Sequence, residues 1–145
     1  MKYEFEMPGS ITGKARPRMN IRTGKAYTPT KTKLYEYALR QWFIMNYPKF
    51  TPIESRVKVS IIVYFEIPKS TSKKNEAEML EGNISPTKKP DIDNIIKIVL
   101  DAMNKFAYKD DTQVTKIDVE KKYSDTPKII VKIEEYWERK NKCQK

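Results

Sequence analysis

The sequence contains no histidine and only one cysteine, Cys143, among its 145 residues. Without histidine, the chain cannot use a Ser-His-Asp or Cys-His catalytic site, a histidine general base, or the histidine ligands of most zinc sites. A single cysteine can form neither an internal disulfide nor a multi-cysteine metal site. Catalysis by this chain would therefore rely on carboxylates, lysines or hard metal ions.

Long apolar runs are also missing. No stretch approaches the ~20 apolar residues that cross a bilayer, and the N-terminus lacks the apolar core of a signal peptide. We therefore expect a cytoplasmic protein with no membrane partner. The length of 145 residues, 39% of them hydrophobic, suits one modest core and predicts a single domain over residues 1–145.

Positive charge is concentrated near the start of the chain. The net charge is +10, and residues 1–50 carry ten basic and three acidic side chains, a balance of +7, against +3 for residues 51–145. Such a surface suits a polyanion, because each phosphate that a lysine or arginine neutralises releases condensed counterions. Nucleic acid is thus the leading partner class, although general solubility would also account for a basic chain.

Apolar periodicity predicts four strands and three helices. Alternating apolar residues indicate strands at 2–7, 57–65, 114–123 and 128–136, with 57–65 central and the last two joined as an antiparallel hairpin by a turn at 124–127. Helices are expected near 30–47, 73–81 and 92–104, and a polar tail at 138–145. In the first helix, the apolar face is expected to comprise Leu34, Tyr37, Ala38, Gln41 and Met45.

The most distinctive segment, residues 88–114, contains two acidic groups. Asp91 and Asp93 follow Pro90 at the start of the third helix, and Asp110-Asp111 follows that helix at a chain reversal before a strand. Asp91 and Asp93 could both bind one Mg²⁺, which typically takes one or two carboxylates together with waters and phosphate oxygens. Alternatively, they cap the helix and favour its positive N-terminal dipole, while Asp110-Asp111 forms an Asp-rich turn.

Lys97 lies four residues after Asp93 and four before Asp101, so the three side chains share one helical face. This spacing is typical of ion pairs between successive helical turns. It would equally place a lysine beside a metal-bound phosphate, where its charge could stabilise the transition state or its proton could go to the leaving oxygen. Spacing alone leaves both interpretations open.

Several of these motifs together resemble the RusA family of Holliday-junction resolvases. The strongest part is the segment at residues 89–94 (KPDIDN) with Lys97, followed by residues 100–104 (LDAMN) and 108–114 (YKDDTQV). Residues 13–18 (GKARPR) and 24–29 (GKAYTP) are similar to the basic N-terminal part of that family. The resemblance covers most of the chain apart from the polar segment at 69–87.

The resemblance implies a single α+β domain in which helices pack on a small mixed β-sheet. It also implies a homodimer that makes paired, Mg²⁺- or Mn²⁺-dependent nicks in four-way junction DNA. The metal-binding aspartates of the family correspond to Asp91, Asp93 and Asp111, and its catalytic lysine to Lys97. Asp110 is then expected to support the turn and Asp101 to orient Lys97. A cation shared by the three aspartates requires their carboxylates to lie within about 8 Å of one another in a folded dimer.

Basic residues from the N-terminal loop at 13–33 are the candidates for phosphate contacts. They are Lys14, Arg16, Arg18, Arg22, Lys25, Lys31 and Lys33. Two other interpretations compete with a nuclease: a non-catalytic protein that binds branched DNA, and a module that binds RNA or single strands. The complete acidic set argues against both, since neither gives Asp91, Asp93 and Asp111 a common role.

Overall fold

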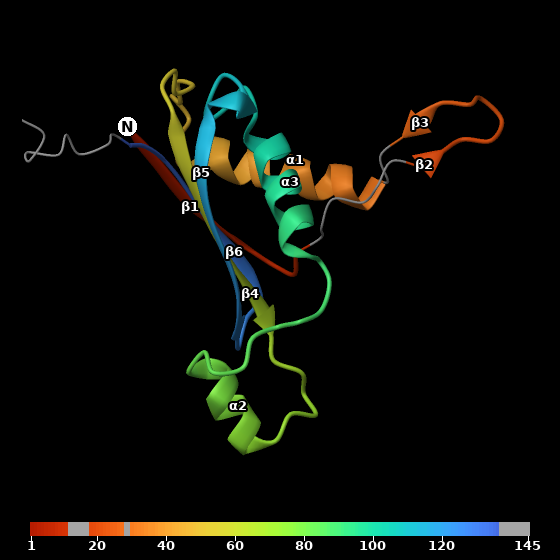
Figure 1. The fold of residues 1–145 in the computed structure, drawn as a ribbon, viewed down its shortest axis with the longest axis vertical. Helices are drawn as coiled ribbons and strands as arrows, with labels where there is room; N and C mark the ends of the chain where they lie inside the picture. Colours follow the sequence, from red (N-terminus) through yellow and green to blue (C-terminus); the bar gives the residue numbers. More distant parts are fainter. Residues whose placement is uncertain (12–17, 28–29, 137–145) are drawn as a thin grey trace, which may run out of the picture.

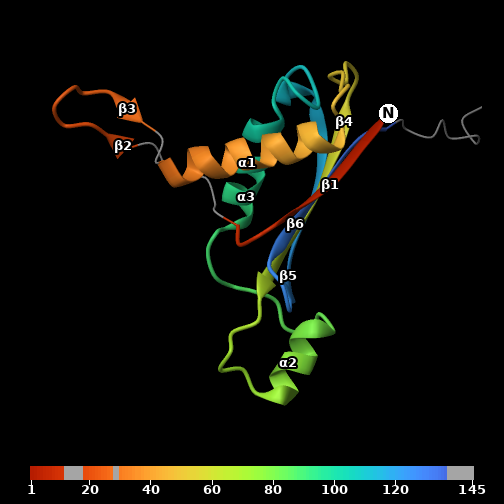
Figure 2. The same cartoon turned by 180° about the vertical axis from the view of Figure 1, so that it is seen from behind.

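The computed structural model describes residues 1–11, 18–27 and 30–136, so Lys14, Arg16 and the tail at 138–145 lie outside the described residues. A four-stranded mixed sheet carries two of the helices on one face, and the third helix lies beyond one end of the sheet (Figures 1 and 2). The strands are β1 (Lys2–Pro8), β4 (Val57–Glu66), β5 (Val114–Ser124) and β6 (Lys128–Glu135), and the helices are α1 (Thr30–Asn46), α2 (Lys73–Leu80) and α3 (Ile92–Met103). This is the expected small α+β fold.

The strand order in the sheet is β1-β6-β4-β5. The predicted central position of β4 is confirmed, because it pairs in parallel with β5 on one side and antiparallel with β6 on the other. A parallel pair needs a crossover connection, which here contains α2 and α3. As a result, α3 starts near the ends of β4 and β5 and finishes near their beginnings (Figure 1).

The predicted hairpin between the last two strands is wrong. The turn sequence at 124–127 is present, but β6 pairs with β4 and β1 rather than with β5. Because β4 has the most continuous apolar sequence, it is stabilised most by a paired strand on each side. The short connection from Ser124 to Lys128 therefore passes the end of β4 instead of folding β6 back on β5.

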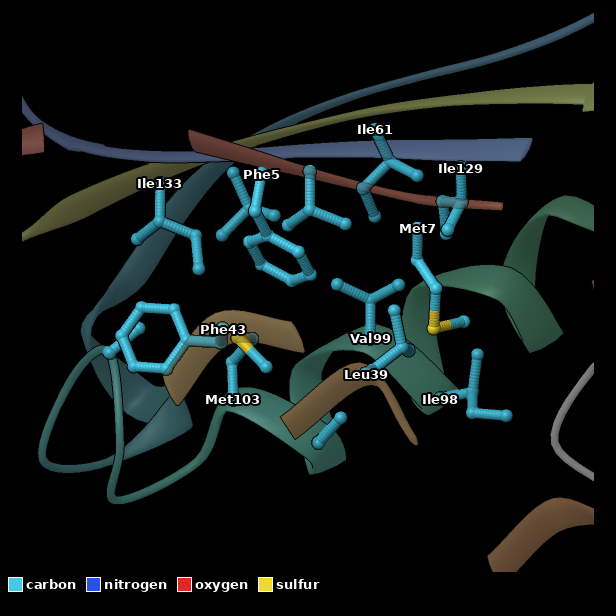
Figure 3. Close-up of a cluster of buried hydrophobic side chains, with 14 of the residues drawn as sticks. Phe5, Met7, Leu39, Phe43, Ile61, Ile98, Val99, Met103, Ile129 and Ile133 are labelled. Atoms are coloured by element: carbon cyan, nitrogen blue, oxygen red, sulfur yellow. The ribbon is translucent and has the colours of Figure 1, made fainter. Parts of the chain in front are cut away.

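The hydrophobic core lies between the sheet and the two helices α1 and α3 (Figure 3). Strand side chains such as Phe5, Ile61 and Ile133 point toward Phe43 of α1 and Met103 of α3 in the close-up (Figure 3). Both β1 and β4 alternate between buried side chains on this side and more exposed ones on the opposite side. The core thus fixes α3, whose two ends carry the candidate site residues.

The apolar face predicted for α1 is also wrong. Leu34, Tyr37 and Met45 are exposed, whereas Tyr35, Leu39, Phe43 and the polar Thr32 are buried. Both sets recur at helical spacing, so periodicity alone could not decide between them. The aromatic residues decided the outcome, since Phe43 packs edge-on against Tyr3 and Phe5 of β1.

The remaining helices agree with the sequence. Ser72 caps α2 by accepting a hydrogen bond from the Asn75 backbone N–H, and Gly82 ends it with a φ of 86°. In α3, the buried residues are Ile95, Ile98, Val99, Ala102 and Met103. None of the helices in the described part of the chain is long and apolar enough to span a membrane.

The basic N-terminal segment contains a short hairpin. Strands β2 (Arg18–Met19) and β3 (Ala26–Tyr27) pair antiparallel, and the chain reverses between them with Gly24 at a φ of 67°. The hairpin projects from the N-terminal end of α1, away from the sheet (Figures 1 and 2). Arg22 and Lys25 are exposed in its turn, and Lys31 and Lys33 are exposed on the first turn of α1. Arg18 begins the hairpin.

The corrected face of α1 can be tested with two leucine substitutions. Leu39→Ala removes a side chain that is 0% exposed and should lower the free energy of unfolding by about 2–5 kcal/mol, because it leaves a cavity. Leu34→Ala removes one that is 62% exposed and should change it by less than about 0.5 kcal/mol. Urea denaturation measures both values, and equal losses would contradict the assigned core.

Candidate active site

Asp91 occupies the N-cap position of α3, but its side chain makes no capping hydrogen bond. An N-cap aspartate ordinarily accepts a hydrogen bond from the backbone of the first turn. Here the carboxylate is exposed and remains available to another partner. Of the two roles that the sequence left open for Asp91, side-chain capping is therefore not the one adopted.

Asp93 lies in the first turn of the same helix and is also exposed. The positive end of the helix dipole favours negative charge at this place and offsets part of the repulsion between the two carboxylates. Two exposed carboxylates at one helix N-terminus match the ligand number that Mg²⁺ takes from a protein, with waters and phosphate oxygens completing the coordination. Asp91 and Asp93 therefore fit a hard divalent cation.

Asp111 lies at the other end of the helix. It begins the short 3₁₀ helix η1 (Asp111–Gln113), which leads into the start of β5. Tyr108, just before this turn, donates a hydrogen bond to the carbonyl of Leu100 in the last turns of α3, over 2.8 Å. Burial raises the pKa of the Tyr108 hydroxyl, and the negative charges of Asp111, Asp101 and Asp110 raise it further. Asp111 thus belongs to the C-terminal end of α3.

Two lengths show how far apart the acidic groups are. The twelve residues of α3 span about 18 Å at ~1.5 Å per residue. Along β5, the Lys121 ammonium contacts the carbonyl of Lys88, three residues before Asp91, while Val114 lies at the strand's start beside Asp111. These two β5 residues are about 23 Å apart at ~3.3 Å per residue. One chain therefore does not bring Asp91, Asp93 and Asp111 together.

The acidic side chains of the chain are dispersed over the described surface. Within residues 1–11, 18–27 and 30–136, no group of three or more carboxylate or cysteine side chains comes together as a metal site. The three predicted ligands are exposed and lie on a rigid helix and its adjoining turn. They divide into a pair at one end of α3 and a single acid at the other.

Gln113 holds the turn that presents Asp111. Its side-chain amide donates to the carbonyls of Ile53 and Ser55, each over 2.7 Å, and its side-chain oxygen accepts from the backbone N–H of Asp110 over 2.9 Å. These bonds tie η1 to the segment before β4. Gln113 is not among the site residues expected from the sequence, and its place in the motif at 108–114 was the available signal for it.

Asp110 also stabilises this turn. The Thr112 hydroxyl donates to its carboxylate over 2.5 Å, and this hydrogen bond lowers the pKa of Asp110 below its usual value. The carboxylate is thus engaged inside the turn, while that of its neighbour Asp111 is exposed. This difference favours Asp111 over Asp110 as a ligand for something outside the turn.

Lys97 and Asp101 lie one and two turns along α3 from Asp93, and both are exposed. The ion pair that the spacing allows between Lys97 and Asp93 is not formed among the described residues. The Lys97 ammonium therefore remains available on the surface of α3. It lies nearer to the Asp91–Asp93 end of the helix than to Asp111.

Comparison with known proteins identifies the family. Residues 8–134 match the family described as "Endodeoxyribonuclease RusA". The chain belongs to the RusA endodeoxyribonuclease family. It is also 38% identical over 136 residues to a Bacillus subtilis (strain 168) protein called "Uncharacterized protein YqaN", an alignment that covers 91% of this chain and 95% of that protein. Membership supports a nuclease that acts on junction DNA, as the sequence motifs had indicated.

The role of Gln113 can be tested by Gln113→Ala. The substitution removes three hydrogen bonds and leaves two partly buried carbonyls without this donor, so the free energy of unfolding should fall by about 2–3 kcal/mol. The matched variant Gln41→Ala changes a half-buried glutamine on α1. It should lower the free energy of unfolding by less than about 0.5 kcal/mol. Urea denaturation measures both. If the two variants are equally stable, Gln113 does not hold this turn.

Proposed function

We propose that this RusA-family protein is a Mg²⁺-dependent endonuclease that resolves four-way DNA junctions by paired nicks, in DNA recombination or repair. The observation that carries the proposal is the pair of exposed carboxylates, Asp91 and Asp93, at the N-terminus of α3, with Asp91 not used as a cap. When bound there, Mg²⁺ or Mn²⁺ would neutralise developing charge on the phosphate and activate a water for hydrolysis.

The chain's own residues supply the remaining parts of the proposed reaction. Asp91 and Asp93 would hold the metal ion with their carboxylates. Lys97, with its ammonium exposed one turn further along α3, stabilises the negative charge of the phosphorane-like transition state or protonates the leaving oxygen. Arg18, Arg22 and Lys25 of the projecting hairpin, together with Lys31 and Lys33, contact the phosphates of the junction arms.

The proposed enzyme acts as a homodimer, for which the separation of the acids gives a physical reason. If Asp111 is a ligand as the family resemblance implies, a second copy must bring its Asp111 to the Asp91–Asp93 pair of the first. A two-fold dimer would then hold two equivalent composite centres, one for each strand that is cut. Such a dimer also mirrors the symmetry of a four-way junction.

A nicking assay on a synthetic four-way junction tests the proposed function. With Mg²⁺, the wild-type chain should nick two opposing strands, and Asp91→Asn should slow nicking by about 100-fold or more, because a ligand is lost where charge develops. The control Asp125→Asn changes an exposed acid in the β5–β6 turn and should leave the rate unchanged. Titration with Mn²⁺ should show weaker metal binding to Asp91→Asn than to wild type, and unchanged metal binding to Asp125→Asn.

Two results would count against this function. The wild-type chain could bind the junction without nicking it at any Mg²⁺ concentration, as a non-catalytic junction-binding protein would. Alternatively, Asp91→Asn could nick as fast as wild type, in which case the carboxylates of α3 are not part of the catalytic centre.

A further inference from the structure

A cavity of about 380 Å³ lies next to the Asp91 end of α3 and includes none of the residues assigned above. Its walls come from the end of β4 and the residues after it, from Ser10 and Ile11 after β1, and from Lys88 and Lys89. The volume falls within the range of about 300–1,000 Å³ that is usual for ligand pockets. Because Lys88 is three residues before Asp91, the cavity lies at most about 11 Å along the backbone from the proposed catalytic pair.

The lining of the cavity combines positive charge with apolar surface. Three lysines, Lys69, Lys88 and Lys89, line it together with a single acid, Glu66. The apolar part comes from Ile11, Phe65, Ile67, Pro68 and Pro127. A nucleotide complements this lining. Apolar contact stabilises its flat base, and ammonium groups stabilise its negatively charged phosphate.

The position of Lys88 is fixed by contacts with the sheet. Its backbone carbonyl accepts a hydrogen bond of 2.6 Å from the Lys121 ammonium of β5. Its own ammonium lies 5.8 Å from the centre of the Phe65 ring, and the Lys121 ammonium lies 5.2 Å from the same ring. These cation–π contacts hold the segment before Asp91 against the ends of β4 and β5. The mouth of the cavity is therefore held at a set place relative to α3.

We propose that this cavity, which we call the lysine pocket, receives one unpaired nucleotide of a DNA strand near the phosphodiester bond that is cut. The base enters between Ile11 and the end of β4, and the adjoining phosphates contact Lys88 and Lys89. A pocket of this size admits a base but not a base pair, so it selects DNA in which a base has left the helical stack. The inference rests on the proposed function and names a source of its selectivity for branched over fully paired DNA.

Binding without Mg²⁺ tests the lysine pocket separately from catalysis. A series of four-way junctions carries one abasic residue each, at successive positions within about five nucleotides of the branch point. Fluorescence anisotropy then gives Kd for wild type and for Ser10→Trp, whose indole would fill the pocket from an exposed position. One abasic position should weaken binding by wild type about tenfold, the order of a lost base contact.

In Ser10→Trp, the intact junction should bind about tenfold more weakly than to wild type, and the abasic residue should cause no additional loss. Lys88→Met offers a second variant that removes charge rather than filling space, and it should weaken binding to intact and abasic junctions alike. The control Lys116→Met alters an exposed lysine near the start of β5, away from the pocket, and should keep the full abasic penalty.

The lysine pocket is overturned if no abasic position affects wild-type binding, or if Ser10→Trp retains the wild-type penalty. Melting temperatures equal to that of wild type show that the variants are folded. Because these measurements contain no metal ion, a chain that binds with the predicted pattern but never nicks would contradict the proposed nuclease function and leave the pocket supported. A chain that nicks the junction, but whose binding no abasic residue weakens, would support the nuclease function and contradict the lysine pocket.

Discussion

The parallel pairing of β4 with β5 is the constraint on which the rest of the structure depends. Two parallel neighbours must be joined by a crossover, so the chain leaves the end of β4 and returns through α3 in the opposite direction. The apolar face of α3 packs on the sheet and holds this direction. The acids that begin the helix and the acid that follows it are consequently held at opposite ends of one rigid element, and no local adjustment of side chains can join them.

Much of the fold follows from local sequence patterns. Alternation of apolar residues predicted all four strands of the main sheet, and the helix expected near 73–81 is found as α2, which Ser72 caps and Gly82 ends. The predictions that failed were those in which two different packing arrangements share the same local sequence pattern. Strand pairing depends on which strand is most apolar over its whole length, and the turn at 124–127 is compatible with either neighbour. The buried face of α1 likewise depended on aromatic partners in β1, which periodicity does not identify.

The sequence identified the individual candidate residues of the site but not their arrangement in space. The D-x-D motif identified Asp91 and Asp93 as candidates, and the structure adds that the Asp91 side chain makes no capping hydrogen bond, unlike that of an ordinary helix cap. Gln113 was missed because its function is a set of hydrogen bonds to carbonyls about sixty residues away. The expectation that three carboxylates share a cation came from the family resemblance, and a single chain does not bring them together. Sequence spacing placed these acids before and after the predicted helix, but the distance between them in space follows from how that helix packs along the sheet.

The central claim is that the acids of α3 from one chain act with Asp111 of another, and mixing two inactive variants tests it directly. Asp91→Asn and Asp111→Asn chains are unfolded together and refolded, so that mixed dimers form. In a mixed dimer, one composite centre carries both substitutions while the other is intact, so nicking of a four-way junction should return and approach half the wild-type rate per mixed dimer. If each centre were built within one chain, both centres of every mixed dimer would be defective, and a mixture no more active than either variant alone would contradict the account.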